Sequence, residues 1–302
     1  MKYLRGVFSA WNKFWFAPID LFPAAVFRIA FAAVIFLQYA FRQVNLLEYY
    51  SDRGVVPLAE ATELLNEIFR PAFFWFPASD AAIVSLHALY LLLILLLGLG
   101  FYSRIIAVFA LVIQVAFLYR NYSVAYGADI ITCYWLLYLC FIESDRELSL
   151  RKKLKLPSLA PKFSDLSLST MGVRLIQIQL CVIYGYTGFE KLKGPGWWEG
   201  TAIWQVMSNQ QLTTLDLSFL QNFPMVIVLM TYSTLIFEIY FPFAVWNPKT
   251  RNWWLAIGFM FHVGIALTMG LIFFSGVMVA AYIVFLNGDY LRARLNLPRS
   301  RV

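Results

Sequence analysis

Long, uninterrupted apolar runs dominate the pattern of hydrophobic and polar positions along this chain. Residues 81–100 and 223–246 form two of them, and each is near or above the roughly 20 apolar residues that a helix needs to cross a hydrocarbon core. The runs are too long for the strands of a membrane barrel, and only helices or closed barrels satisfy backbone polar groups in lipid. The pattern therefore predicts an all-α, polytopic transmembrane helical bundle.

The apolar runs predict about eight spans, of which the fourth has the shortest uninterrupted apolar part. The spans lie at about 22–47, 81–100, 103–119, 127–143, 171–189, 223–246, 252–268 and 270–287. We expect an amphipathic N-terminal segment at 1–20, a transmembrane domain at 21–290 with halves 21–143 and 171–290, and a basic tail at 291–302.

Composition agrees with a membrane protein. Hydrophobic residues make up 61% of the 302 residues and charged residues 14%, against roughly 45–50% and about 25% in soluble domains. The 10 Trp, 17 Tyr and 28 Phe suit aromatic belts at two membrane interfaces. A soluble interior could not hold so many long apolar runs, so we expect membrane lipids to surround the chain.

The charges predict how the spans are oriented. In a soluble protein the net charge of +7 would indicate a nucleic-acid partner, but here the basic residues lie in short loops beside the spans, so we expect none. If both termini are cytoplasmic, most of the 24 Lys and Arg lie on the cytoplasmic side, as the positive-inside rule requires. The basic linker 144–170 is then cytoplasmic, and the segments 48–80 and 190–222 face outward.

Two segments outside the spans look amphipathic. The first 20 residues interleave basic and aromatic side chains without a continuous apolar core or a small-residue cleavage site, so they predict a segment lying flat on the cytoplasmic surface rather than a signal peptide. Residues 57–69 place apolar side chains opposite three glutamates at helical spacing, after Pro57. They predict an interfacial helix on the outer leaflet.

Five ionisable residues fall inside predicted spans. Such groups are costly in lipid and usually face a bundle interior or a cavity. They can hold the helices together by pairing, and Arg28 with Glu238 is the simplest neutralising pair. His87 lies alone on an aliphatic face, which favours a packing role. The five are Arg28, His87, Asp129, Glu238 and His262.

The segment 185–204 carries the densest polar chemistry. A span ends there in the doublet Glu190–Lys191, and a Gly/Pro turn and the pair Trp197–Trp198 follow. A lysine at an apolar boundary is partly desolvated, and a desolvated lysine is usable as a base or nucleophile. The alternative is that Lys191 snorkels to the interface beside an aromatic belt.

Several other chemistries lack a signature. His87 and His262 lie on distant spans without ligand spacing, so we expect no metal site. No phosphate-binding glycine motif and no nucleophile elbow occurs, so no nucleotide is expected. The three cysteines include no CxxC pair, so the chain is not itself a dithiol oxidoreductase.

A set of short motifs, in order and at fitting spacing from about Ile19 to Leu286, resembles the HTTM (horizontally transferred transmembrane) family, whose best-known members are the vitamin K-dependent γ-carboxylases. The motifs are Ala25-Val26-Phe27-Arg28, Gly100-Phe101-Tyr102-Ser103-Arg104, the stretch from Asn121 to Asp129, Gly188-Phe189-Glu190-Lys191-Leu192, Trp197-Trp198-Glu199-Gly200, Phe237-Glu238 and Phe261-His262.

The resemblance implies a site. Lys191 matches the lysine regarded as the base that deprotonates vitamin K hydroquinone, on the side of the membrane that the charges predict for it here. Glu190 would be its charge partner, with Glu238 and His262 as the polar floor. The catalytic candidates are Lys191 and Glu190, and the candidates for binding a quinone or isoprenoid lipid are Arg28, Asn121, Tyr122, Asp129, Trp197, Trp198, Glu238 and His262.

The chain also departs from the carboxylases. Tyr122 lies in a stretch where they have a histidine, and their large lumenal domain has no counterpart before Val302, so glutamate carboxylation is not expected. Bacterial relatives resemble sporulation-delaying protein B, which takes part in maturing a secreted peptide toxin, and others occur beside thioredoxin-like DCC-type proteins. The alternative role is therefore that of a non-catalytic inner-membrane subunit, with a secreted peptide or a DCC-type thiol oxidoreductase as partner.

Overall fold

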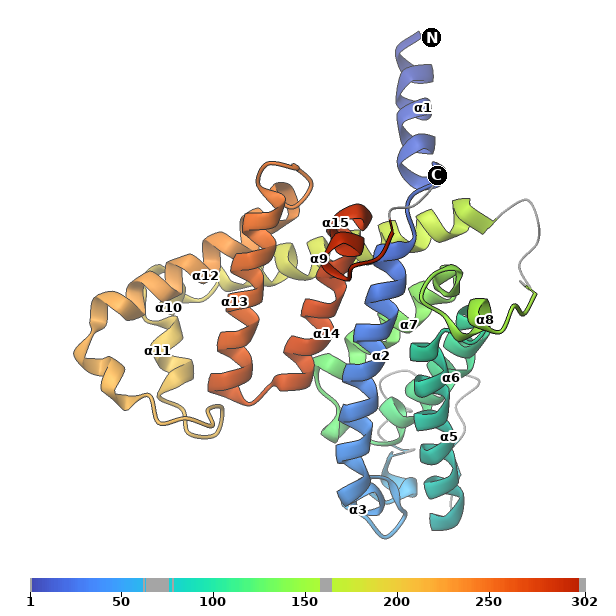
Figure 1. Ribbon diagram of the computed structural model, residues 1–302. Helices are drawn as coiled ribbons and strands as arrows, with labels where there is room; N and C mark the ends of the chain where they lie inside the picture. Colours follow the sequence, from blue (N-terminus) through green and yellow to red (C-terminus); the bar gives the residue numbers. More distant parts are fainter. Residues whose placement is uncertain (1, 62, 64–75, 78, 158–164, 299–302) are drawn as a thin grey trace. The chain divides into compact units, whose positions relative to one another are not determined.

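The computed structural model describes residues 2–61, 63, 76, 77, 79–157 and 165–298 (Figure 1). Over these residues the regular structure is helical. The longer helices are α1 (Lys2–Phe16), α2 (Phe22–Arg42), α5 (Asp80–Leu99), α6 (Ser103–Arg120), α7 (Gly127–Leu139), α9 (Asp165–Lys191), α12 (Pro224–Ala244), α13 (Arg251–Met269) and α14 (Ile272–Tyr282). The shorter ones are α3 (Leu46–Tyr50), α8 (Leu150–Lys153), α10 (Pro195–Trp198), α11 (Ala202–Met207) and α15 (Gly288–Arg294).

The predicted all-α transmembrane architecture is confirmed. Within the described residues, six helices are long and apolar enough to cross a membrane, and two bent helix pairs bring the count to eight if each pair is one span. The bent pairs are 127–139 with 144–153, at 67°, and 272–285 with 288–294, at 114°. They coincide with the fourth and eighth predicted spans, so the predicted eight is the upper value that the helices allow.

The chain forms two compact units. Unit 1 comprises residues 1–174 and 288–302, and unit 2 comprises residues 175–287. The division falls inside the continuous helix α9, and α15, near the end of the chain, belongs to unit 1.

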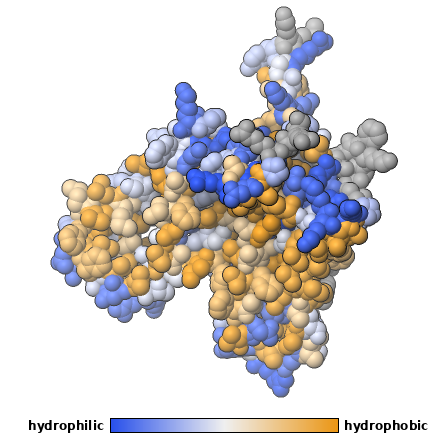
Figure 2. All heavy atoms as spheres, viewed as in Figure 1, coloured by the Kyte–Doolittle hydropathy of each residue, from blue (hydrophilic) through white to orange (hydrophobic). Residues whose placement is uncertain are grey.

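In unit 1, α2 packs against α5, α5 against α6, and α6 against α7. The Ser79 side chain accepts a hydrogen bond from the Ala82 amide at the start of α5, and Gly100, at φ +71°, ends the helix in the left-handed conformation that glycine adopts readily. Apolar residues also cover the outer sides of these helices, where Leu92 and Phe109 are exposed. Figure 2 shows apolar residues along the helices and hydrophilic residues gathered towards their ends, which is the distribution that a lipid environment requires.

At each end of unit 1, an arginine joins neighbouring segments by donating hydrogen bonds to backbone carbonyls. At one end Arg120 donates to the carbonyls of Val56 and Ser51 at 2.9 Å each. At the other, Arg104 donates to the Phe141 carbonyl at 2.9 Å. Consecutive spans of this unit therefore alternate in direction, as the predicted topology requires.

In unit 2, α12 packs against α13 and α13 against α14. Thr214 joins the loop after α11 to the end of α13, because its amide donates to the Thr268 carbonyl at 2.8 Å. At the other end, Arg251 donates to the Val245 carbonyl at 3.0 Å. The segment 190–222 and the C-terminal end of α13 therefore lie at one end of unit 2, which we call the loop end.

The predicted amphipathic segments have different outcomes. The first of them contains the helix α1, on which Tyr3, Phe8 and Trp11 are exposed. The predicted helix at 57–69 lies mostly outside the described residues. Orientation of the chain relative to the two sides of a membrane stays a prediction.

Candidate functional site

A close crossing of α9 and α12 positions the candidate base. At Gly188 a Cβ atom would come within 2.9 Å of the Ile239 side chain and 3.0 Å of its backbone nitrogen. Only glycine leaves the two backbones room to approach this closely, and small residues are the usual means of close helix packing in membranes. The crossing brings Lys191, the last residue of α9, beside Glu238 in the middle of α12.

Lys191 and Glu238 form an ion pair at this crossing. Lys191 Nζ donates to Glu238 Oε2 at 2.7 Å, and the Lys191 side chain is 24% exposed whereas that of Glu238 is 5% exposed. The ammonium lies 5.4 Å from the centre of the Trp197 ring, within the range of a cation–π contact. We call Lys191, Glu238 and Trp197 the Lys191 site.

The predicted pairing of Lys191 with Glu190 is wrong. Glu190 instead accepts a hydrogen bond from Lys193 at 2.6 Å, and this pair is exposed. Consecutive helix residues point about 100° apart, whereas residues three apart lie on one face. The hydrogen bond from Lys193 to the Glu190 carboxylate raises the pKa of Lys193, so Glu190 contributes to the charge balance of Lys193 rather than to that of Lys191.

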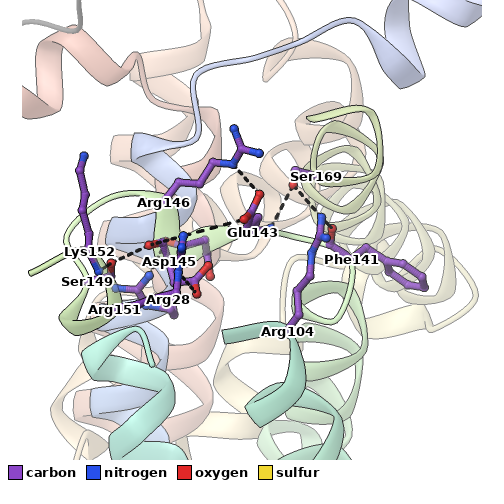
Figure 3. Close-up of polar contacts among 11 residues, drawn as sticks. Arg28, Arg104, Phe141, Glu143, Asp145, Arg146, Ser149, Arg151, Lys152 and Ser169 are labelled. Atoms are coloured by element: carbon purple, nitrogen blue, oxygen red, sulfur yellow. Dashed lines mark hydrogen bonds and ion pairs between the residues drawn. The ribbon is translucent and has the colours of Figure 1, made fainter. Parts of the chain in front are cut away.

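The predicted pairing of Glu238 with Arg28 is also wrong. Arg28 is fully buried in unit 1, where it donates to the carbonyls of Ser144, Leu148 and Gly98, the second of these at 2.6 Å. Figure 3 shows it below the turn that carries Asp145. The three carbonyls lie on two segments, the connection that holds Ser144 and Leu148 and the end of α5, so Arg28 acts as a structural clamp between them.

The clamp belongs to a larger polar cluster that joins the turns at one end of unit 1 (Figure 3). Arg151 donates to Asp145 at 2.8 Å, and Ser169 accepts from the Glu143 amide at 3.0 Å. The cluster consists of Arg28, Arg104, Glu143, Asp145, Arg146, Ser149, Arg151, Lys152 and Ser169 with the backbone of Phe141.

Tyr184 and His262 form a second polar group in unit 2. The Tyr184 hydroxyl is hydrogen-bonded to His262 Nε2 at 2.6 Å and also to the Tyr282 hydroxyl. His262 is 1% exposed. Tyr184 lies seven residues, or about two turns, before Lys191 on α9. His262 Nε2 is therefore paired with Tyr184, which is in turn hydrogen-bonded to Tyr282.

The other candidates separate into two groups. Trp198 lies at the loop end of unit 2, is 63% exposed, and donates from its indole to the Leu192 carbonyl at 2.7 Å. Asn121, Tyr122 and Asp129 lie in unit 1, so the structure does not bring them together with Lys191 in one unit.

In unit 1, Asp129 pairs with Arg42 at 2.7 Å and accepts from Gln38 at 3.1 Å. Asn121 donates to the Tyr49 carbonyl at 2.7 Å, and Tyr122 is 62% exposed. Because their polar groups are occupied by neighbouring segments, Asp129 and Asn121 stabilise the end of the unit.

Sequence reasoning missed Tyr184, which is hydrogen-bonded to His262, and Tyr282, which is hydrogen-bonded to Tyr184. The available signal was a hydroxyl in an otherwise apolar span, which must find a partner because an unpaired buried hydroxyl is costly. His87 has a similar arrangement, with its Nε2 3.0 Å from the Tyr39 carbonyl. Among the described residues, no group of three His, Cys, Asp or Glu side chains has the geometry to hold a metal ion.

The long apolar helices and the paired ionisable groups buried among them define a multi-pass α-helical membrane protein. The chain belongs to the HTTM domain family, which matches residues 16–290. It is similar to sporulation-delaying protein SdpB of Bacillus subtilis (strain 168), with 29% identity over 121 residues that cover 37% of this chain and 36% of SdpB. The chain thus matches about a third of that curated relative's length. No solved structure matches the chain.

Proposed function

We propose that the Lys191 site is a proton-transfer site of a bacterial inner-membrane protein, at which Lys191 acts as a base towards a quinone-like or other isoprenoid lipid. The observation that carries this proposal is the Lys191–Glu238 pair, in which a partly exposed amine is hydrogen-bonded at 2.7 Å to a carboxylate that is almost fully buried. A reduced quinone would supply an acidic phenolic O–H.

The pair can take up one proton without leaving an isolated charge. Lys191 passes one of its protons to the Glu238 carboxylate and takes a proton from the lipid O–H. Lys191 is then again an ammonium, now beside the new oxyanion, and Glu238 is neutral. This is favourable at a buried position, because an ionised carboxylate is costly to keep away from water.

The surroundings of Lys191 support access from the membrane side. Tyr186 and Phe189 are exposed on the last turns of α9, and Trp197 offers a ring face beside the ammonium. An apolar tail and an aromatic head group both find matching surfaces there. The residues that contact the lipid then belong to unit 2. Trp197 packs against the quinone ring, and Glu238 accepts the proton.

Lys191→Arg tests the proposal. A guanidinium keeps the positive charge and the amphipathic stem but stays protonated at any relevant pH, so we expect loss of activity with normal insertion, in a complementation assay in cells that lack the gene. Lys191→Met removes the charge and should have the same effect. Mass spectrometry of extracted lipids should find the same bound quinone in all three proteins. If Lys191→Arg retains wild-type activity, Lys191 is an interface anchor and the proposal fails.

The second candidate function is that of an accessory subunit in the maturation or export of a secreted peptide, with a DCC-type thiol oxidoreductase as partner. The match to SdpB is the observation that favours it. A gene for a small secreted peptide or a DCC-type protein beside this one supports the accessory role. The accessory role does not require the amine of Lys191. Activity that survives in Lys191→Arg therefore favours the accessory role over the proton-transfer role.

A further inference from the structure

Two adjoining hollows lie at the loop end of unit 2, and neither is lined by a residue of the Lys191 site. The first, of about 330 Å³, is walled mainly by Trp204, Pro224, Ile227 and Val228, and we call it the apolar hollow. The second, of about 300 Å³, has Ser208, Gln210, Thr213 and Asp216 on its wall, and we call it the polar hollow. Trp204 and Gln221 line both. Each is at the lower end of the size range of small-molecule pockets.

We propose that these hollows form a binding site for a short extended peptide segment that carries an apolar side chain next to a positively charged one. The apolar side chain would enter the apolar hollow against Trp204, and the cation would lie in the polar hollow near Asp216. This inference does not depend on Lys191 acting as a base; it rests on the second candidate function, for which it names the residues and the peptide chemistry.

The charge of the lining favours a cationic ligand. Asp216 is the single charged residue among the described residues that line the two hollows. Its Oδ1 accepts a hydrogen bond from the Ser218 amide at 2.9 Å, which holds the pKa of Asp216 below its usual value. The described lining therefore presents a carboxylate and no basic side chain. This carboxylate attracts an ammonium or guanidinium and repels the phosphate of a lipid head group.

The lining also keeps hydrogen-bonding capacity for a ligand. Within the part of the chain that the structure describes, the side chains of Trp204, Gln210 and Gln221 make no hydrogen bond. A side-chain amide can both donate and accept, so the two glutamines match the alternating N–H and C=O groups of an extended backbone. An apolar lipid tail cannot form hydrogen bonds with these amides, whereas a peptide backbone can.

The walls of the site are held in place before any ligand arrives. The Thr214 hydroxyl donates to the Leu267 carbonyl at 3.1 Å. Gly270, at φ +68°, follows the end of α13, and a Cβ atom added to it would lie 2.8 Å from the Thr214 side chain, so glycine allows this close approach. At the apolar hollow, which Gly200 lines, the Thr231 hydroxyl donates to the Gly200 carbonyl at 3.1 Å. A preformed site loses less entropy on binding than a mobile one.

Fluorescence anisotropy with defined peptides tests the proposal on the full-length protein in phosphatidylcholine nanodiscs. The probes are a labelled octapeptide of alternating leucine and lysine, its leucine–glutamate counterpart and a serine–lysine peptide. We expect the leucine–lysine peptide to bind above the level of empty nanodiscs, and the other two to stay at that level. Binding of the leucine–glutamate peptide at equal strength would overturn the proposal, and so would the absence of leucine–lysine binding.

Three variants locate the binding. Asp216→Asn should weaken leucine–lysine binding about 2- to 5-fold at low salt, as expected for an exposed charge pair. Trp204→Ala should weaken it at least ~10-fold, because buried aromatic anchors contribute most at such sites. The matched control is Glu199→Gln, which removes an exposed acid that lines neither hollow and should leave binding unchanged. An equal effect of Glu199→Gln and Asp216→Asn would show unspecific charge attraction and refute the site.

Two further measurements distinguish this proposal from the proton-transfer proposal and from a lipid site in the hollows. Lys191→Arg should bind the leucine–lysine peptide like the wild type, whether or not it is active. Native mass spectrometry should show the peptide bound to the wild type and absent from Trp204→Ala. A phospholipid that stays bound to the wild type in the presence of the peptide, and is lost in Trp204→Ala, would make the hollows a lipid site and overturn the proposal.

Discussion

Single glycines decide how closely the helices of unit 2 approach. Gly188 faces the backbone of Ile239, so Gly188→Ala has to push α9 away from α12. We expect a destabilisation of about 1–3 kcal/mol, the usual cost of overpacking a close contact, and a longer distance between Lys191 and Glu238. Thermal unfolding of the purified protein in detergent measures the first effect.

Gly264→Ala is the matched control for Gly188→Ala. Gly264 also lies within a helix of unit 2, but a Cβ atom there would meet nothing within 4 Å. Alanine is favoured over glycine in a helix by roughly 0.5–1 kcal/mol, so this variant should be neutral or slightly stabilised. Equal loss of stability in both variants would show that the crossing at Gly188 is not tight.

At this scale the sequence could predict which residues were unusual, but not their partners. Lys191 and Glu238 both stood out as ionisable groups at or within spans, and the family resemblance singled out Lys191. Their pairing depends on the rotation of α9 about its own axis and on the crossing at Gly188, which hydropathy does not report. The Glu190–Lys193 pair was predictable, because Lys193 follows Glu190 by three residues in the turn that directly continues α9.

At the scale of elements, the spans were predictable because each apolar run must be long enough to cross the hydrocarbon core. The last helix was not. α15 turns away from the preceding helix by 114°, and its Arg292 donates to Asp20 at 2.6 and 2.9 Å. A contact between residues 272 positions apart leaves no trace in local periodicity.

The contact between α15 and Asp20 should depend on pH. Burial raises the pKa of Asp20, but the hydrogen bonds from Arg292 and from the Phe22 amide lower it more, so the pKa lies below its usual value. A carboxyl whose pKa is lower in the folded state stabilises that state above its unfolded pKa of about 4 and loses this effect as the pH falls through the folded value. Asp20→Asn should therefore lower Tm at pH 7, and the difference from wild type should shrink below about pH 4.

The control for this prediction is the exposed Asp289, which lies 3.8 Å from Arg292. Asp289→Asn keeps the two hydrogen bonds between Arg292 and Asp20, so its Tm should stay near that of the wild type across the same pH range. A difference between Asp20→Asn and the wild type that is constant from pH 7 to pH 3 would contradict the assigned role of the carboxylate.

At the scale of the whole molecule, the distribution of basic residues predicts orientation. Alkaline phosphatase is active only outside the cytoplasm, so a fusion after residue 210 should be active and a fusion after residue 158 inactive. The reason is the excess of Lys and Arg in the segment 144–170. The reverse pattern would put the Lys191 site and the two hollows on the cytoplasmic side and would refute the eight-span topology.

The sequence predicted two halves, the second beginning at residue 171, but it did not predict that α15 belongs to unit 1. The basic linker 144–170 separates two groups of four predicted spans, and it is the obvious place for a boundary in the sequence. The structural boundary falls inside α9, so this continuous helix contributes its first part to one unit and its last part to the other.

The membership of α15 in unit 1 has a consequence for how the protein is made. Unit 2 is an insertion in the middle of unit 1, and a ribosome delivers the chain from its N-terminus. The first spans can enter the membrane early. Asp20, however, binds Arg292 next to Gly288, which leaves room for the carboxylate. This contact cannot form until residues 175–287 have been synthesised and inserted. Assembly of the first unit to enter the membrane is therefore the last to be completed.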